Sequence, residues 1–336
     1  MTQKRVLVLG GTAMLGGEIA RTAVARGHHV TCVARGDAGT FPKGTTVIRA
    51  DRDSENGLAG VAEQPWDAVY DVARLPGQVR RAVRDLAGAA LYVFVSTCNV
   101  YAAQDEPVAD ESAALLEPLD SDTAEPADFY GRRKVACENL VLGGFETSHS
   151  LIARSGLIGG PGDTTTRSGY WPMRFAASDD VIVPDDPQLP TQLIDVRDFA
   201  GWLVDAAGSD SIRGIANVVG DTVAFGDYLE TARRVADHHG RVVAASREWL
   251  LGHGVQEFAG PKSMPLWLSD PDWRAFMDRS NARAKQLGLS IRPLSETLAD
   301  VLEWERAEGL DRPRKTGLTT REQDELVALF ARRQLS

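Results

Sequence analysis

The sequence predicts an α/β protein: a doubly wound parallel sheet followed by a smaller, mixed α/β region. Two observations support this prediction. Through the first half of the chain, short runs of β-branched and aromatic residues alternate with helical patterns, and such alternation favours parallel strands joined by helical crossovers. The first of these runs passes directly into a glycine-rich turn and then into a helical stretch.

The expected elements follow one another in a regular order. Strands are predicted at residues 5–10, 29–34, 46–50, 67–73, 91–97 and 150–155. Helices are predicted between them at residues 14–26, 54–62, 77–88 and 128–144. The segment 102–128 interrupts this order and is rich in Asp, Glu and Pro, with no Lys or Arg. We predict a solvated loop there, with some character of a flap because it joins Thr97 to Tyr130.

Composition limits the class of protein. The chain has 336 residues, of which 43% are hydrophobic and 25% are charged, as is ordinary for a soluble globular protein. The formal charge of −10 disfavours nucleic acid as a partner, and the apolar runs are too short for a membrane span. Three cysteines without metal-ligand spacing, and a start without a signal-peptide pattern, favour a reducing cytoplasm and no metal site.

The glycine-rich turn after the first strand predicts a phosphate site. Glycine is needed where backbone amides and a helix N-terminus approach a dinucleotide pyrophosphate closely. Strand, turn and helix together therefore indicate a Rossmann-type dinucleotide-binding domain. The predicted cofactor contacts in this turn are Gly10, Thr12, Ala13, Met14, Leu15 and Gly16.

A second feature is the pair Tyr130 and Lys134. A spacing of four residues places both side chains on one face of the helix predicted there. A cation beside a phenol favours the phenolate, so Tyr130 is a candidate for proton transfer near neutral pH. The alternative is a surface lysine that lies over a packed ring. Thr97 ends the strand predicted at 91–97, and a strand end is where an open α/β sheet places its active site.

These features together resemble the extended short-chain dehydrogenase/reductase family, the NAD(P)-dependent epimerase/dehydratase-like proteins. The resemblance covers nearly the whole chain. It rests on Gly10-Gly11-Thr12-x-x-Leu15-Gly16, Ser96-Thr97-x-x-Val100-Tyr101, Tyr130-Gly131-x-x-Lys134 and Leu193-Ile194-Asp195-Val196-Arg197-Asp198-Phe199-Ala200. The run Gly156-Leu157-Ile158-Gly159-Gly160-Pro161-Gly162-Asp163 is more similar to an atypical bacterial branch of reductases or epimerases of unknown substrate.

The resemblance implies an oxidoreductase and a role for each residue of its motifs. Thr97 would hold the substrate oxygen and Tyr130 would give or take its proton. Lys134 would bind the nicotinamide ribose and keep the phenol acidic, while the nicotinamide carries the hydride. Asp51 matches the acid that contacts the adenine. Two further residues, Arg52 and Ala73, are assigned to the cofactor as well.

The end of the second strand predicts the choice of cofactor. Ala34 occupies the place where an acid would bind the ribose 2′-hydroxyl of NAD(H), and Arg35 next to it can pair with a 2′-phosphate. The sequence therefore favours NADP(H) over NAD(H). NAD(H) remains an alternative cofactor if the turn bends the Asp37 carboxylate back to the ribose.

The residues after Thr97 narrow the reaction. Dehydratases of the family carry an Asp-Glu pair there, whereas this chain has Cys98 and Asn99, which do not replace titrating carboxyl groups. We expect a reductase or dehydrogenase that acts on a carbonyl or hydroxyl group of a small metabolite, with Asn99 near the substrate. A nucleotide-sugar epimerase and a non-catalytic NADP(H)-binding sensor are the alternatives.

The second half of the chain, 156–336, is expected to bind the substrate, after a dinucleotide-binding domain at 1–155 to which parts of the later chain return. It holds six of the seven tryptophans. Trp171 and Trp267 lie beside proline-broken segments and are candidates to line a pocket for an aromatic substrate, although buried tryptophans are mostly core. A homodimer through the helix that carries Tyr130 and its neighbour near 77–88 is a further expectation.

Overall fold

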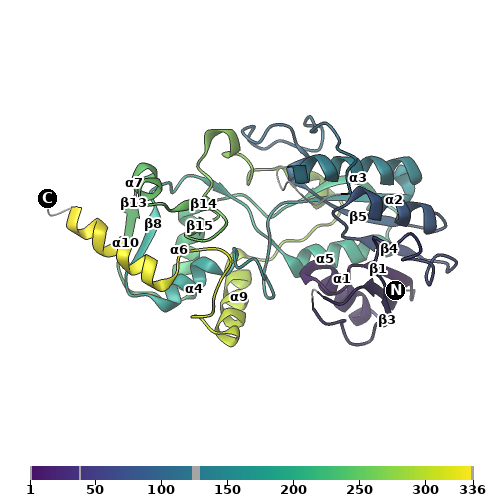
Figure 1. Cartoon of the computed structure of the whole chain (residues 1–336), viewed down its shortest axis with the longest axis horizontal. Coiled ribbons are helices and arrows are strands. Elements are labelled where there is room, and N and C mark those ends of the chain that lie inside the picture. Colours follow the sequence, from purple (N-terminus) through teal and green to yellow (C-terminus); the bar gives the residue numbers. More distant parts are fainter. Residues whose placement is uncertain (1, 38, 123–128, 334–336) are drawn as a thin grey trace.

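A seven-stranded parallel sheet forms the centre of one half of the molecule (Figure 1). The computed structural model describes residues 2–37, 39–122 and 129–333. The strands lie in the order β11-β6-β5-β4-β1-β2-β3, and every neighbouring pair is parallel. Their bounds are β1 Arg5–Leu9, β2 His29–Ala34, β3 Thr46–Arg49, β4 Ala68–Asp71, β5 Tyr92–Thr97, β6 Ser150–Ser155 and β11 Gly214–Val218.

The six strands predicted from the sequence are confirmed, and a seventh was missed. β5 and β6 are buried along their whole length, as expected for strands covered on both faces. The missed strand, β11, pairs with β6 at the edge of the sheet and sets Asn217 beside Arg154. Its run Gly-Ile-Ala-Asn-Val is short and has a polar residue at a buried position, so the apolar pattern does not reveal it.

Two pairs of helices cover the sheet, one pair on each face (Figure 1). α1 (Met14–Ala25) packs against α5 (Val196–Asp205), and α2 (Pro76–Asp85) packs against α3 (Tyr130–Gly144). Buried apolar residues form a separate core on each face. The helices predicted at 14–26, 77–88 and 128–144 are confirmed, except that residue 128 lies outside the described residues.

The prediction of a helix at 54–62 is wrong, because this segment folds as a series of tight turns. The amides of Ser54 and Gly57 donate to carbonyl oxygens three residues earlier in the chain. A Cβ atom at Gly57 would lie 2.2 Å from the backbone oxygen of Asp51, so the turn requires glycine there. Glycine also disfavours a helix interior, and the apolar periodicity of this segment does not compensate for it.

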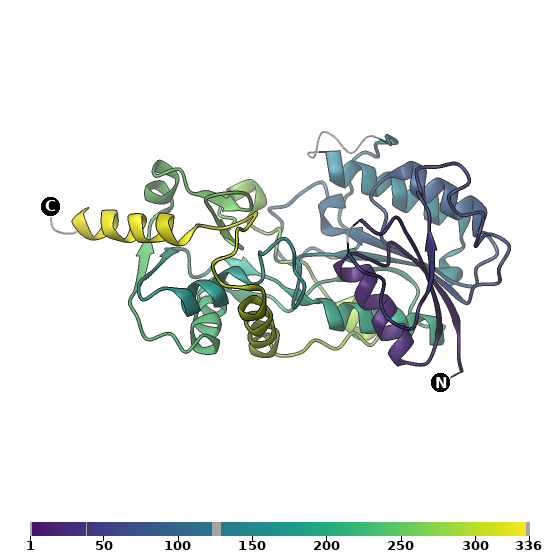
Figure 2. The same cartoon turned by 60° about the horizontal axis from the view of Figure 1, so that its bottom comes forward.

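The second half of the chain forms a smaller, mixed α/β region with a core of its own (Figure 2), while α5 and β11 return to the large sheet. Its strand pairs are β7 Ile158–Gly159 with β10 Ile194–Asp195, β8 Val181–Pro184 with β13 Val242–Ala245, β9 Pro190–Thr191 with β12 Val223–Ala224, and β14 Gln256–Phe258 with β15 Ser263–Pro265. Its helices are α4 Tyr170–Ala177, α6 Phe225–Val235, α7 Arg247–Gly252, α9 Leu294–Glu308 and α10 Thr320–Arg333, whereas α8 Ala282–Gln286 packs against β11 of the large sheet. Single 3-10 turns are η1 Cys98–Val100, η3 Thr147–His149, η4 Ala206–Gly208 and η5 Pro271–Trp273. The division into domains after residue 155 stays a prediction.

Hydrogen bonds to other elements hold the acidic segment after β5 in the part that the structure describes, 102–122. The side chain of Glu111 accepts a hydrogen bond from the amide of Asn217, at 2.6 Å. Further along, Asp122 accepts one from the amide of Gly77 in α2. The remaining residues of this predicted loop, 123–128, lie outside the described residues.

Within the described ranges, no helix is long and apolar enough to cross a membrane. In the same ranges, no group of three or more His, Cys, Asp or Glu side chains is placed to hold a metal ion. The three cysteines, Cys32, Cys98 and Cys137, are buried and free.

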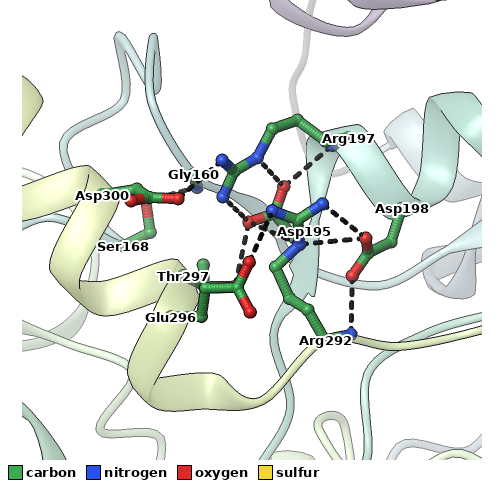
Figure 3. Close-up of polar contacts among 9 residues, drawn as sticks. All are labelled: Gly160, Ser168, Asp195, Arg197, Asp198, Arg292, Glu296, Thr297 and Asp300. Atoms are coloured by element: carbon green, nitrogen blue, oxygen red, sulfur yellow. Dashed lines mark hydrogen bonds and ion pairs between the residues drawn. The ribbon is translucent and has the colours of Figure 1, made fainter.

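A cluster of ion pairs joins the start of α5 to the start of α9 (Figure 3). Asp195 is 2% exposed and caps α5. Its carboxylate accepts hydrogen bonds from the backbone and guanidinium of Arg197 and from the hydroxyl of Thr297 in α9. Arg292 pairs with Asp198 at 2.8 Å and approaches Asp195 at 3.6 Å. Burial acts to raise the pKa of Asp195, but its hydrogen bonds and the charge of Arg197 hold that pKa below its ordinary value.

We expect Asp195→Ala to lower the free energy of unfolding at neutral pH by about 2–3 kcal/mol, measured by chemical denaturation. The substitution removes the cap of α5 and one carboxylate partner of Arg197 and Arg292, which keep Asp300 and Asp198. The loss is smaller than for a fully buried pair because both arginines keep some contact with water. The pKa of Asp195 is lowered in the folded state. Its contribution is therefore present above pH about 4 and is lost as the pH falls toward that lower pKa.

Glu325→Ala is the matched control, since it removes an exposed carboxylate that pairs with Arg321 on α10. This variant should unfold like the parent protein. Equal stability of Asp195→Ala and Glu325→Ala would contradict the structural role of Asp195.

Candidate active site

Lys134 lies buried at the carboxyl ends of β4 and β5. Its Nζ donates hydrogen bonds to the carbonyl oxygens of Ala73, at 2.8 Å, and Val95, at 2.5 Å, and lies 4.0 Å from the centre of the Phe94 ring. Burial lowers the pKa of Lys134 to about 8, although the charges of nearby acidic groups act in the opposite direction. These contacts fix the first turns of α3 to the edge of the sheet.

Tyr130, one helical turn before Lys134, lies next to Thr97. The Thr97 hydroxyl accepts a hydrogen bond from the amide of Asn99 and donates one to the Asn99 side chain, at 2.9 Å. Burial raises the pKa of the Tyr130 phenol, while the charge of Arg74 and a hydrogen bond with Thr97 act to lower it. The structure therefore brings four residues singled out from the sequence to one edge of the sheet: Thr97, Asn99, Tyr130 and Lys134.

The expected influence of Lys134 on the phenol needs correction. The Lys134 ammonium points to backbone carbonyl groups, and the guanidinium charges that lower the pKa of Tyr130 are those of Arg74 and Arg133. Burial outweighs these charges, and the pKa of the phenol rises. Tyr130 therefore keeps its proton at neutral pH instead of being a ready phenolate.

The glycine-rich turn forms a cradle in front of α1. Gly10 has a φ of +101°, in the left-handed region, and a Cβ atom at Gly16 would lie 2.2 Å from the Gly10 carbonyl oxygen. Ala13 has φ −82° and ψ 169°, which alanine adopts without strain. No side chain of the described residues caps the first amides of α1. The cradle and these amides fit the phosphate groups of a dinucleotide.

Two arginines stand at the ends of β2 and β3. Arg35 is exposed and pairs with Asp37 at 3.3 Å. Arg49 is in register with Ala34 of the neighbouring strand, donates to the Arg35 carbonyl oxygen at 3.3 Å and lies 5.3 Å from the centre of the Phe41 ring. The sequence indicated Arg35 but not Arg49, because only the pairing of β2 with β3 brings the two together.

Arg52 is engaged in a buried ion pair, which corrects its assignment to the cofactor. Its two terminal nitrogens donate to the Asp71 carboxylate at 2.7 and 2.9 Å, and Tyr92 donates to the same carboxylate at 2.7 Å. Burial acts to raise the pKa of Asp71, but the charge and hydrogen bonds of Arg52 hold it below its ordinary value. The amide of Ala73 also donates to Asp71, whereas Asp51 is exposed.

Trp171 and Trp267 lie in the core of the second half of the chain. Both side chains are 0% exposed, and Trp171 Nε1 donates to the carbonyl oxygen of Pro265 at 2.7 Å. Trp171 also packs edge-on against Phe225. The prediction that these two tryptophans line a substrate pocket is therefore corrected, because neither side chain is accessible.

A buried polar network that the sequence did not reveal lies behind the end of β5. Arg154 of β6 donates to both carboxylate oxygens of Glu138 in α3, at 3.1 and 2.8 Å, and to the Tyr101 hydroxyl at 3.2 Å. Ser96 donates to Glu138 as well. The one local signal for this network is the position of Glu138, one helical turn after Lys134 on the same face.

A cavity of about 310 Å³ opens beside the ion-pair cluster of Figure 3. Its lining residues are Leu193, Asp195, Asp198, Asp221, Val223, Tyr228, Ile291, Arg292, Pro293, Leu294 and Thr297. The three carboxylates in this lining already pair with arginine or lysine side chains. Neither Tyr130 nor Lys134 contributes to the lining, so we assign this cavity no part in the chemistry.

The chain is similar to known reductases in sequence. The 2'-dehydrokanamycin reductase of Streptomyces kanamyceticus is 28% identical over 222 residues, which cover 63% of this chain and 60% of that protein. The 3-diazoavenalumate denitrifying reductase of a Streptomyces species is 30% identical over 244 residues, which cover 66% of this chain and 77% of that protein. A scan against models of protein families finds no match.

The fold has known relatives too. The UDP-N-acetylglucosamine 4-epimerase from Bacillus cereus has a TM-score of 0.68 at 14% identity, over 93% of this chain and 99% of that one. The chain spans only 60% of the length of the first reductase, but 77% of the second. It belongs to the extended short-chain dehydrogenase/reductase family, the NAD(P)-dependent epimerase/dehydratase-like proteins, and has their Rossmann-like fold.

We expect Lys134 to titrate near pH 8, because burial disfavours its ammonium form. The chain has only six lysines, so NMR of protein with carbon-labelled lysine can follow each signal through a pH series. The signal that titrates near pH 8 should disappear in Lys134→Met and persist in Lys285→Met, which removes an exposed lysine. A Lys134 signal that titrates at the ordinary value of about 10.4 would refute the burial argument.

Proposed function

We propose that this protein is an NADP(H)-dependent oxidoreductase that acts on a carbonyl or hydroxyl group of a small metabolite by hydride transfer, with Tyr130 as proton donor or acceptor. One observation supports this proposal most. Tyr130, Thr97 and Lys134 meet at the carboxyl edge of the parallel sheet, the edge from which the glycine cradle and the uncapped N-terminus of α1 also rise. Open parallel sheets bind their ligands at this edge.

Each residue has a defined task in the proposed reduction. Thr97 and Tyr130 bind the substrate oxygen through their hydroxyl groups. A bound nicotinamide would supply the hydride and would itself be oxidised. As the carbonyl carbon is reduced, its oxygen takes the electron pair of the broken π bond and then the proton of Tyr130, which gives the alcohol. Lys134 would bind the nicotinamide ribose.

Reduction is favoured over the family's other reactions. Both sequence relatives described above are named as reductases. Burial raises the pKa of Cys98 to about 12, so its thiol is no substitute for the carboxyl group of a dehydratase. Arg154 pairs with Glu138, and Arg174 donates to the carbonyl oxygen of Leu318, so neither of these two is free to bind the diphosphate of a nucleotide sugar, whereas the terminal nitrogens of Arg167 have no partner among the described residues. With Trp171 and Trp267 buried, an aromatic substrate has no particular support.

The arginines at the ends of β2 and β3 favour NADP(H) over NAD(H). A ribose 2′-phosphate is an anion that guanidinium groups bind through charge and paired hydrogen bonds. Phe41 and the Arg35 carbonyl oxygen orient Arg49. Arg35 can exchange Asp37 for a phosphate at little cost, since that ion pair is exposed and therefore weak.

We expect Tyr130→Phe to lower kcat by about 10²–10⁴-fold, because the variant keeps the ring but has no proton to transfer. Consumption of NADPH with a panel of aldehydes and ketones measures turnover, and NADPH fluorescence measures binding. The affinity for NADPH should stay within about twofold of the parent protein. Unchanged turnover in this variant would end the catalytic assignment, and NADPH binding without turnover in the parent would favour the sensor.

We expect Arg35→Ala and Arg49→Ala each to weaken NADPH binding by about tenfold and to leave NADH binding unchanged, since each removes a charge-assisted contact to the 2′-phosphate. Fluorescence titration with both cofactors measures this. Lys43→Ala is the control, because Lys43 is an exposed cation of the connection between β2 and β3. Equal affinities of the parent protein for NADPH and NADH would refute the preference.

A further inference from the structure

We propose that Arg167 and Arg74 form an anion subsite beside Tyr130, so that the substrate carries a carboxylate or phosphate group close to its reducible carbonyl. This inference rests on the proposed function and names its substrate class. The two arginines come from different halves of the chain. Arg74 follows β4 of the large sheet, and Arg167 precedes α4 in the second region.

A rigid turn holds Arg167. The buried carboxylate of Asp163 accepts four hydrogen bonds, from the amides and hydroxyls of Thr165 and Ser168. The Thr165 hydroxyl in turn accepts one from Arg167 Nε at 3.1 Å, and the guanidinium lies 5.2 Å from the centre of the Phe258 ring. In the part of the chain that the structure describes, the two terminal nitrogens of Arg167 have no hydrogen bond or ion pair.

The Arg167 guanidinium lies near Tyr130 and is partly buried. Burial lowers the pKa of Arg167, while the charges of Asp163 and Tyr130 act to raise it. The Asp163 oxygens are already occupied by the turn, so this acid forms no ion pair with Arg167 among the described residues. A partly desolvated cation without a paired carboxylate is stabilised when an anion binds to it.

Arg74 acts on Tyr130 from the side of the large sheet. It follows Ala73, whose carbonyl oxygen holds the Lys134 ammonium, and the charge of Arg74 acts on both Lys134 and Tyr130. Arg74 is exposed, and among the described residues it has no hydrogen bond or ion pair. The Arg74 charge therefore acts on the Tyr130 phenol, the phenol acts on Arg167, and both guanidinium groups are available to a ligand.

The position of this pair relative to Tyr130 defines the substrate class. An anion held by Arg74 and Arg167 places the neighbouring atoms of the same molecule at the phenol, where the carbonyl oxygen must receive its proton. A carboxylate next to the carbonyl, as in a 2-oxo acid, and a phosphate a few bonds away both match this arrangement. Guanidinium pairs bind either group through paired hydrogen bonds.

The test measures the binding of simple anions to the protein saturated with NADP⁺, so that the cofactor fills its own phosphate sites. The probes are benzoate, its neutral analogue benzamide and inorganic phosphate, each titrated by calorimetry. We expect benzoate or phosphate to bind more tightly than benzamide, and the tighter of the two anions distinguishes a carboxylate from a phosphate substrate. Arg167→Ala and Arg74→Ala should each weaken that binding by about tenfold or more, and Arg167→Lys should restore part of it.

Arg321→Ala, which removes an exposed arginine on α10, is the matched control and should bind the anions like the parent protein. Equal anion binding by the parent and Arg167→Ala, or a loss of NADP⁺ affinity in Arg167→Ala, overturns the subsite. Turnover separates the two proposals. Equal kcat/KM for a 2-oxo acid and its methyl ester would leave the reductase standing and exclude the subsite. Anion binding that depends on Arg167, without reduction of any carbonyl compound, would leave the subsite standing and exclude the reductase.

Discussion

Burying an ammonium group costs free energy unless its protons are bound. Lys134 meets this condition through the carbonyl oxygens of Ala73 and Val95 and the face of the Phe94 ring. These acceptors lie at the carboxyl ends of two neighbouring strands, so the contact fixes α3 across both of them. Tyr130 precedes Lys134 by one turn on the same face of the helix. Fixing the ammonium therefore also places the phenol beside Thr97, and the proposed chemistry follows from a packing contact.

The same face of α3 carries a second buried charge one turn later. Glu138 and Arg154 are each 2% exposed in their ion pair, and Ser96 donates to the carboxylate as well. A buried ion pair is a poor source of net stability, because desolvation offsets the attraction between the charges. It does have a strict geometry, since either partner alone would be a buried, unpaired charge. We infer that Glu138 and Lys134 fix the orientation of α3 more than they stabilise it.

Local patterns were sufficient for six of the seven parallel strands and for Tyr130, Lys134 and Thr97, because each depends on residues close together in the chain. The arginine contacts that the sequence did not predict depend on partners far apart in the chain. In the sequence Arg52 is an ordinary basic residue after a strand. In the structure both of its terminal nitrogens donate to the carboxylate of Asp71, which lies on another strand. Arg154, Arg167 and Arg174 look alike in the sequence. Only the folded chain shows that Arg154 and Arg174 have partners within the protein, whereas the terminal nitrogens of Arg167, among the described residues, have none.

The raised pKa of Tyr130 suits a reductase better than a ready phenolate would. A carbonyl that receives a hydride becomes an alkoxide, which is a far stronger base than any phenolate, so a phenol that holds its proton firmly can still protonate it. Burial ensures that this proton is present at neutral pH. Arg74 and Thr97, which act to lower the same pKa, then stabilise the phenolate as it forms. Oxidation of an alcohol would instead need the phenolate at the start, which burial disfavours. The environment of Tyr130 thus matches the protonated state with which the proposed reduction starts.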